Sequence, residues 1–243
     1  MLSVKSLLLA ALASVAYAAP ACQPSATPTI PKTGGATELP VPAANLVLKK
    51  IALGHGIQNY TCANTSATGV SQGAVAVLYD VTSFYPGTAK SGIVQKIWDE
   101  APGLVLKLKS LPLNIKTGSK YGADPAKPFP KPEDLKVAGF PVAKFLGHHY
   151  FDAAGTPMFD LNAVGLQASV TKLLGVDAPA KADKGPLNTG AVAWLQLGDS
   201  GKGLSKGLSQ VYRVITAGGA AQSCAVAGAG VHSVPYTTYY WFY

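Results

Sequence analysis

A serine and a histidine in this chain lie in contexts that could support nucleophilic catalysis. Ser71 is the centre of Gly-Val-Ser-Gln-Gly, which matches the turn that presents a catalytic serine between a strand and a helix. His232 lies late in the chain, and Asp177 or Asp199 could orient it as a general base. The run Ala74–Tyr79 after the motif suits a strand as well as a helix. A secreted serine hydrolase is therefore kept as one alternative interpretation.

Two histidines and one arginine are candidates for binding. His55 and His149 would form part of a zinc or copper site if both pointed at one ion. His148 would point to the opposite face of a strand from its neighbour His149. Arg213 lies between apolar residues, and an inward orientation would require an acidic partner. Three residues could supply that carboxylate: Asp80, Asp152 and Asp160.

Complete metal and cofactor motifs are absent from the sequence. No Cys-x-x-Cys pair is present. The triplets Gly54-His55-Gly56 and Gly228-Ala229-Gly230 begin like a dinucleotide-binding fingerprint, but each lacks the third glycine. We expect neither a bound metal nor a cofactor, and a histidine metal site remains the second alternative.

Lysine dominates the charge of the chain. The formal net charge is +8, and Arg213 is the only arginine. Proteins that read DNA bases depend on arginine, so the composition argues against sequence-specific nucleic-acid binding. Eight lysines lie between Lys107 and Lys144, where they outnumber the acidic residues. This segment predicts a solvated loop, or a surface that adheres to anionic wall polymers or membrane surfaces.

The amino-terminal residues predict export. Residues 1–18 have a lysine, a short apolar run and an Ala-Tyr-Ala cleavage site, as secretory signal peptides do. No later segment approaches transmembrane length, so we expect no membrane span. In an oxidising compartment two of the three cysteines should pair. We predict Cys62–Cys224, and Cys22–Cys62 is the competing pair.

Two sequons for N-linked glycosylation lie close together in the sequence. Asn59 is followed by Tyr-Thr and Asn64 by Thr-Ser. Asn64 is the better candidate because its surroundings look like a loop, whereas Asn59 lies in a predicted strand. In an exported chain we therefore expect a glycan at Asn64 rather than at Asn59.

The elements that must position these residues are mainly strands. The chain has 243 residues and is 48% hydrophobic, with 26 glycines and 18 prolines. That content favours short strands over a helical bundle. We predict an all-β antiparallel sandwich or partly closed barrel. The expected strands are Leu46–Leu53, Ile57–Cys62, Ala74–Val81, Leu104–Leu108, Phe145–Phe151, Leu166–Leu174, Ala191–Leu197, Gln210–Thr216 and Tyr236–Tyr243.

One short helix and one long loop complete the expected fold. Ser91 could cap the helix, and Pro102 would stop it. Residues 116–141 contain five prolines and predict a long ordered loop, or an insertion packed over one end of the sheets. Residues 19–45 are rich in Pro, Thr and Ala and predict a flexible or extended leader. A single β domain then spans residues 46–243.

Five ordered blocks resemble a known family. They are His55–Cys62, Gly147–Phe151, Ala193–Leu197, Val211–Gly219 with Cys224, and Val234–Tyr243. In this order they resemble a domain-of-unknown-function family that is common in fungal secretomes and also found in bacteria. Its members often carry the automatic name malate dehydrogenase. The resemblance implies a secreted, mainly β domain and brings no established catalytic residues.

The function expected from these observations is binding outside the cell. Hydride transfer by a dehydrogenase needs a dinucleotide cradle, which this sequence does not complete. We therefore expect a secreted extracellular or cell-wall-associated protein that binds a cell-wall polysaccharide or a host surface without catalysing a reaction.

Overall fold

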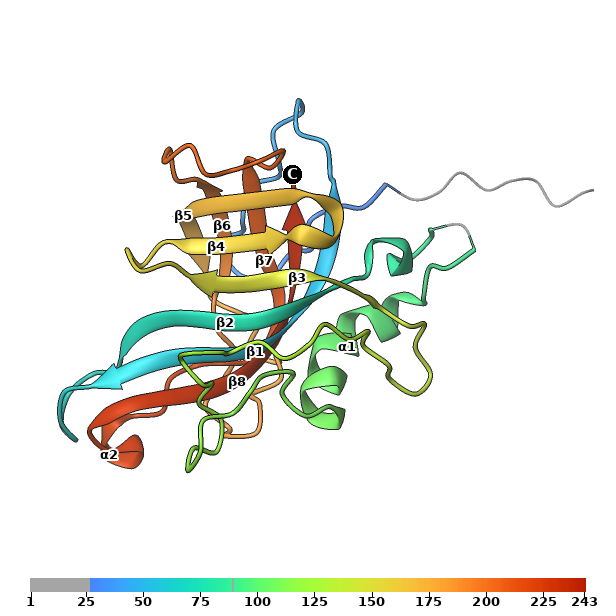
Figure 1. Ribbon diagram of the computed structural model, residues 1–243. Helices are drawn as coiled ribbons and strands as arrows, with labels where there is room; N and C mark the ends of the chain where they lie inside the picture. Colours follow the sequence, from blue (N-terminus) through green and yellow to red (C-terminus); the bar gives the residue numbers. More distant parts are fainter. Residues whose placement is uncertain (1–26, 89) are drawn as a thin grey trace, which may run out of the picture.

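The structure is a computed structural model that describes residues 27–88 and 90–243 (Figure 1). Eight antiparallel strands form a closed barrel in which each strand pairs with the next, and the last pairs with the first. The all-β antiparallel prediction is confirmed, and the barrel closes completely. The predicted signal peptide and Cys22 lie outside the described residues. The strands are β1 Lys50–Cys62, β2 Val70–Asp80, β3 Lys144–Phe151, β4 Pro157–Leu161, β5 Leu166–Val176, β6 Trp194–Asp199, β7 Gln210–Gly218 and β8 Gly230–Phe242.

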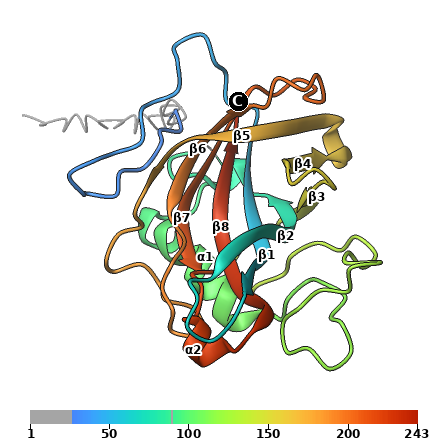
Figure 2. The same ribbon diagram turned by 90° about the vertical axis from the view of Figure 1, so that its left-hand side faces the viewer.

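The barrel wall has two buried faces, because residues along each strand alternate between them. Side chains such as Leu78, Phe159 and Tyr240 fill the interior. Their neighbours in sequence, such as Tyr79 and Tyr239, point outward into a second core. Figure 2 shows the helix α1 and long loops outside the barrel wall. The outer core lies between this wall and those covering segments.

β1 is one continuous strand, although the sequence suggested two strands separated by Gly54-His55-Gly56. Both glycines have the inward parity of Ala52. A Cβ at Gly54 would lie 2.6 Å from the ring of Tyr240, and one at Gly56 would lie 2.0 Å from the carbonyl oxygen of Val75. The glycines therefore admit close contacts inside the barrel and do not interrupt the strand.

The helix α1 spans Gln95–Leu108, later and longer than expected, and Pro102 lies inside it. The prediction of a strand at Leu104–Leu108 is therefore wrong. Five buried residues at helical spacing form the inward stripe: Trp98, Ala101, Pro102, Val105 and Leu106. Proline cannot donate the backbone hydrogen bond to the carbonyl four residues earlier. The Tyr239 hydroxyl donates to that carbonyl of Trp98 instead, at 3.0 Å.

The carboxyl-terminal strand β8 is buried on both faces, as its aromatic sequence predicted. Tyr239 stacks on Trp98 with ring centroids 4.1 Å apart on the outer side. On the inner side, the hydroxyl groups of Tyr236 and Tyr240 form a hydrogen bond of 2.9 Å. β8 pairs with β1 along its whole length and with β7 between Tyr236 and Phe242, and so closes the barrel.

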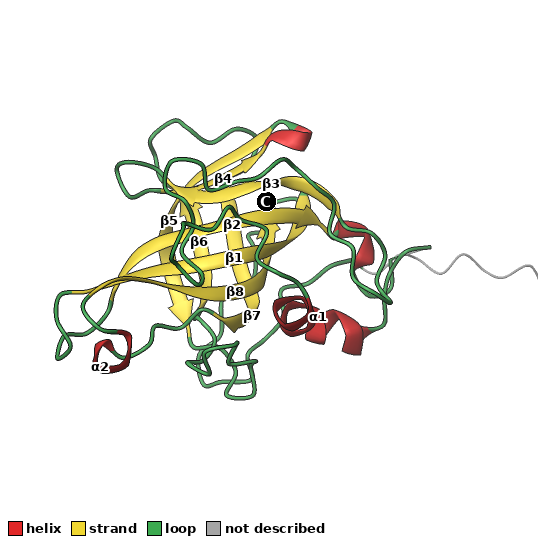
Figure 3. Ribbon diagram, turned by 60° about the horizontal axis from the view of Figure 1, so that its bottom comes forward, coloured by secondary structure: helices red, strands yellow, loops and turns green. Residues whose placement is uncertain are grey.

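Several smaller elements differ from the sequence prediction. The short strand β4, which begins at Pro157, was missed. A short helix that the sequence did not indicate, α2, spans Cys224–Ala227. Residues 27–45 have neither helix nor strand (Figure 3). They nevertheless contact the barrel, because Leu39 is buried and the Pro40 carbonyl accepts a hydrogen bond from Tyr212.

None of the described helices is both long and apolar enough to cross a membrane.

Candidate functional site

The loop of residues 109–143, between α1 and β3, lies against the outer face of the barrel. Buried Leu113, Leu135 and Val137 anchor it in the outer core. Asp134 fixes its end, since its carboxylate accepts hydrogen bonds from the Phe145 amide at 3.0 Å and the Lys144 ammonium at 2.8 Å. The loop therefore has a defined position. Six lysines of this loop are exposed: Lys109, Lys116, Lys120, Lys127, Lys131 and Lys136.

A groove of about 730 Å³ lies between this loop and strands β1 to β3. Three lysines and two acidic residues line its loop side: Lys109, Lys131, Lys136, Glu133 and Asp134. His55 and His148 belong to its barrel side and flank Val77, because both pair with that residue in the sheet. The lysines can attract an anion, and three loop prolines offer apolar contacts to a flat ring: Pro112, Pro130 and Pro132.

The two groove histidines favour their neutral forms. Burial, together with the charge of Lys109, lowers the pKa of His55 to about 4. Burial also lowers the pKa of His148, and the nearby Asp160 carboxylate opposes that effect. The Phe129 ring stacks on the His148 ring with centroids 3.9 Å apart. At neutral pH positive charge in the groove therefore comes from its lysines.

A second group of polar side chains, the inner cluster, lies inside the barrel. It consists of Gln58, His149, Arg213, Tyr236 and Tyr240. His149 stacks on Phe159 with ring centroids 4.1 Å apart, and its Nδ1 lies 2.8 Å from the Met158 carbonyl oxygen. The His149 ring also meets the edge of Tyr240 at 5.5 Å.

The inner cluster is neutral except for Arg213. Burial lowers the pKa of His149, the hydrogen bond to Met158 opposes that shift and the charge of Arg213 adds to it, and the resulting pKa is about 4. Burial raises the pKa of Tyr236 well above its usual value. Burial also raises the pKa of Tyr240, while the Arg213 charge and the Tyr236 hydroxyl oppose that rise. A neutral imidazole and two neutral phenols therefore surround one guanidinium.

Arg213 has no carboxylate partner of the kind that the sequence suggested. It lies on the inward face of β7, in register with Tyr240. Its Nε and one Nη donate to the Ala193 carbonyl oxygen at 3.1 and 2.8 Å. The three ion pairs found among residues 27–88 and 90–243 are Lys50–Asp80, Lys107–Asp183 and Lys144–Asp134. The expected structural ion pair is replaced by a backbone carbonyl, which supplies only a partial charge.

The structure separates the three predicted binding residues. His149 and Arg213 both lie on the inner face of the barrel, whereas His55 lies in the groove on the outer face. Both histidines pair with β2: His55 lies opposite Val77, and His149 lies opposite the preceding residue, Ala76. Because successive side chains of a strand point to opposite faces, the two imidazoles lie on opposite faces of the barrel wall. His55 and His149 therefore cannot bind one metal ion together, as the second alternative required. Within the described part of the chain no group of three or more His, Cys, Asp or Glu could hold a metal ion.

Ser71 and His232 lie on neighbouring parts of the sheet without touching. Ser71 is exposed in β2, and the chain continues as that strand and not as a helix. Tyr60 pairs with Ser71 on one side and with His232 on the other. Two strand spacings separate the serine and the histidine backbones by about 10 Å. The Nε2 of His232 lies 2.9 Å from the Gly228 carbonyl oxygen, and this geometry is not a nucleophile–base pair.

The disulfide joins Cys62 and Cys224, as predicted, with their Cα atoms 5.6 Å apart. It ties the end of β1 to α2. The first sequon lies in β1, where the Asn59 side chain accepts a hydrogen bond from Ser233 at 2.7 Å. Asn64 is exposed in the loop that follows Cys62. Asn64 is the more accessible of the two, and its Oδ1 accepts a hydrogen bond from the Ser66 amide at 2.9 Å.

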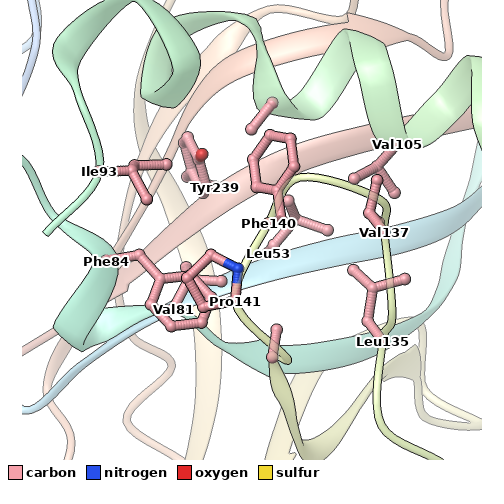
Figure 4. A pocket seen from close by; sticks show the side chains of 12 residues that line it. Leu53, Val81, Phe84, Ile93, Val105, Leu135, Val137, Phe140, Pro141 and Tyr239 are labelled. Carbon is pink, nitrogen blue, oxygen red and sulfur yellow. The ribbon is translucent and has the colours of Figure 1, made fainter. Parts of the chain in front are cut away.

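Two other hollows lie beside α1. Figure 4 shows an apolar space of about 20 Å³ between α1, the barrel wall and the loop of residues 109–143, which is large enough for roughly one water molecule. A wider groove of about 1250 Å³ lies between α1 and the segment before β6. Lysines and acidic residues share its lining, and Lys107 and Asp183 pair across it at 2.6 Å. The small space is apolar, and the wider groove carries charges of both signs.

Sequence reasoning missed three members of the inner cluster: Gln58, Tyr236 and Tyr240. Each has the same parity on its strand as residues of the interior core. Period-two alternation was visible in β7, where Arg213 shares the inward parity of Val211. Extending that alternation to β1 and β8 would have placed these polar residues on the same side.

Comparison with known proteins assigns a family. The chain matches the family described as Protein of unknown function (DUF3455) over residues 42–243. No curated protein and no solved structure matches it. The match spans the whole barrel, including the lysine-bearing loop and every residue of the inner cluster. The chain therefore belongs to the DUF3455 family of proteins of unknown function.

Proposed function

We propose that this protein is exported and binds an anionic polymer, such as an acidic cell-wall polysaccharide, through the loop of residues 109–143 and the groove beneath it. The observation that carries the proposal is the gathering of six exposed lysines on one anchored segment. Three acidic residues lie in the same loop, and one of them, Asp134, pairs with Lys144 outside it. The loop therefore carries a net positive charge.

Anchoring makes this surface suited to binding. A flexible lysine-rich loop loses conformational freedom when it binds, whereas an ordered one has already lost it. Prolines and buried leucines fix the loop before a ligand arrives. The aromatic strand β8 lies in the core and takes no part.

The disulfide supports export, because such bonds persist in oxidising compartments. A binding role fits the separation of Ser71 from His232 better than the hydrolase alternative does.

Chromatography on an immobilised acidic polysaccharide tests the proposal. Purified oxidised protein should be retained on polygalacturonate at low salt and released as sodium chloride screens the charges. Chitin, which is uncharged, should retain much less. A triple variant, Lys109→Gln with Lys131→Gln and Lys136→Gln, should elute at lower salt. Its control changes three exposed lysines elsewhere to glutamine: Lys49, Lys172 and Lys206.

Both triple variants remove the same charge, so they separate a specific surface from a general effect of net charge. Equal elution of the two would refute a role for the groove. Failure of the unmodified protein to bind polygalacturonate at low salt would overturn the whole proposal.

A further inference from the structure

His148 is the histidine of the lysine-bearing groove that solvent reaches. Its side chain is half-buried and lines the groove, whereas the side chain of His55 is only 1% exposed. Histidine is the side chain that ordinarily changes its charge between about pH 5 and pH 8. Protonation of His148 therefore changes the potential that an anionic ligand meets in this groove.

Two aromatic rings fix the position of the His148 imidazole. The ring of Phe129, from the loop of residues 109–143, stacks on it with centroids 3.9 Å apart. The ring of Phe145, on β3, forms a T-shaped contact with centroids 5.2 Å apart. The face of an aromatic ring attracts a cation. The contact with Phe129 thus holds the imidazole at the groove and stabilises its protonated form.

On the barrel side, one charged group faces His148. The Asp160 carboxylate belongs to the residue opposite His148 on β4. Burial lowers the pKa of His148, and the Asp160 charge raises it. On the other side His148 lies opposite the apolar Val77 of β2, and beyond that residue lies the neutral His55 of β1. Two phenols share this outer face, and burial raises the pKa of both: Tyr79 and Tyr150.

On the loop side, the charged groups are those that line the groove. They are Lys109, Lys131, Lys136, Glu133 and Asp134. Asp134 already pairs with Lys144 at 2.8 Å, so the lysines exceed the acidic residues that are free to balance them. An anionic polymer attracted by these lysines brings negative charge close to His148, and nearby negative charge favours the imidazolium form.

From this arrangement we propose that His148 makes anion binding in the groove dependent on pH, so that the polymer is held more tightly in mildly acidic than in alkaline solution. The inference rests on the proposed function of the groove and adds its regulation. Linkage requires the effect to be reciprocal: if bound anion favours protonation, protonation favours binding by the same factor. Above the range in which His148 titrates, the lysines alone attract the ligand.

Calorimetric binding of an oligogalacturonate at two pH values tests the inference. At low salt the unmodified protein should bind about fivefold more tightly at about pH 5.5 than at about pH 8, the effect of one additional ion pair. His148→Gln keeps a polar side chain that cannot be protonated, and it should lose this dependence. His232→Gln is the matched control, since His232 is also half-buried but lies near the start of β8 outside the groove. It should keep the full dependence. Any titration of the ligand is common to all three proteins.

Proton uptake by the unmodified protein gives a second measurement that does not require the His148→Gln variant to fold. Calorimetry in two buffers with different ionisation enthalpies should show protons taken up on binding at about pH 6 and almost none at about pH 8.

The outcomes separate this inference from the proposed function. Equal affinity at both pH values without proton uptake, a dependence that His148→Gln retains, or one that His232→Gln also loses would overturn the role of His148 and leave anion binding intact. Absence of binding at both pH values would refute the proposed function and the inference together.

Discussion

The hydroxyl of Tyr239 donates a hydrogen bond to the backbone carbonyl of Trp98 at 3.0 Å. That carbonyl lies four residues before Pro102, whose ring nitrogen cannot donate to it. A side chain of β8 therefore replaces the hydrogen bond that α1 lacks. This contact explains how a proline can lie in the buried stripe of the helix, where it packs against the barrel.

Replacing Tyr239 by phenylalanine should reveal the dependence of the helix on this hydroxyl. Tyr239→Phe leaves the buried carbonyl of Trp98 without a donor, so we expect the free energy of unfolding to fall by about 1–3 kcal/mol. In a Pro102→Ala background the new amide can donate to that carbonyl, and the same change should cost less. Urea denaturation of the four proteins measures the difference.

Tyr150→Phe is the control, because the Tyr150 hydroxyl makes no hydrogen bond within the described part of the chain. It should leave stability nearly unchanged. An equal cost of Tyr239→Phe in both backgrounds would show that Pro102 and Tyr239 act independently.

Stability should fall as the pH is lowered from about 6.5 to 4. Burial lowers the pKa of both His55 and His149 from 6.5 to about 4, so the unfolded chain binds protons in this range and the folded protein does not. Each histidine can remove up to about 3 kcal/mol of stability across that range. Urea midpoints at a series of pH values measure the slope.

His149→Gln removes one of these two imidazoles. The variant should be less stable at pH 7 but should lose less stability on acidification. Identical slopes for the variant and the unmodified protein would mean that His149 is not protonated on unfolding.

The Cys62–Cys224 disulfide should contribute strongly to stability, because it joins residues 162 positions apart. Long closed loops restrict the unfolded chain, and loss of such a bond costs about 2–5 kcal/mol. We expect a Cys62→Ser and Cys224→Ser double variant to unfold at lower urea than the oxidised protein. Cys22→Ser, which leaves the pair intact, serves as the control. Equal midpoints for all three proteins would refute the contribution.

Gly54→Ala should disrupt the barrel interior. Its new methyl group would lie 2.6 Å from the Tyr240 ring, and overpacking of this kind costs about 1–3 kcal/mol. Gly69→Ala is a suitable control, since the nearest atom to its Cβ would be 3.7 Å away. Thermal unfolding should separate the two variants. A Gly54→Ala protein as stable as Gly69→Ala would mean that Tyr240 moves aside without cost.

Asn64 should accept an N-linked glycan when the protein is made in a eukaryotic secretory host. Its side chain is exposed, whereas Asn59 is bonded within the sheet. Asn64→Gln should therefore reduce the intact mass by one glycan, and Asn59→Gln should not. Mass spectrometry checks both, and an unchanged mass for Asn64→Gln would refute the prediction.

Much of the fold could be predicted from alternation and composition. Strands such as β7 showed their period of two, and the aromatic run in β8 indicated burial on both faces. The helix was misjudged because Pro102 looked like a stop signal. The helix tolerates Pro102 because Tyr239, a residue more than a hundred positions away, replaces the missing hydrogen bond. Local sequence cannot reveal such a partner.

The candidate sites were harder to predict because they depend on parity across the whole barrel. His55 and His149 looked equivalent as histidines near strand ends, yet they lie on opposite faces of one wall. Arg213 was singled out as an isolated charge between apolar residues. Its real surroundings, Gln58 and two tyrosines, come from distant strands that only barrel closure brings together.

The pairing of β8 with β1 has a consequence for how the protein is made. The last strand of the chain is hydrogen-bonded to the first, from Phe242 opposite Lys50 to Gly230 opposite Cys62. Until β8 has left the ribosome, β1 exposes an unpaired edge that invites association with other chains. The barrel can close only once β8 has emerged, so the newly made chain passes through an interval in which it depends on protection from aggregation.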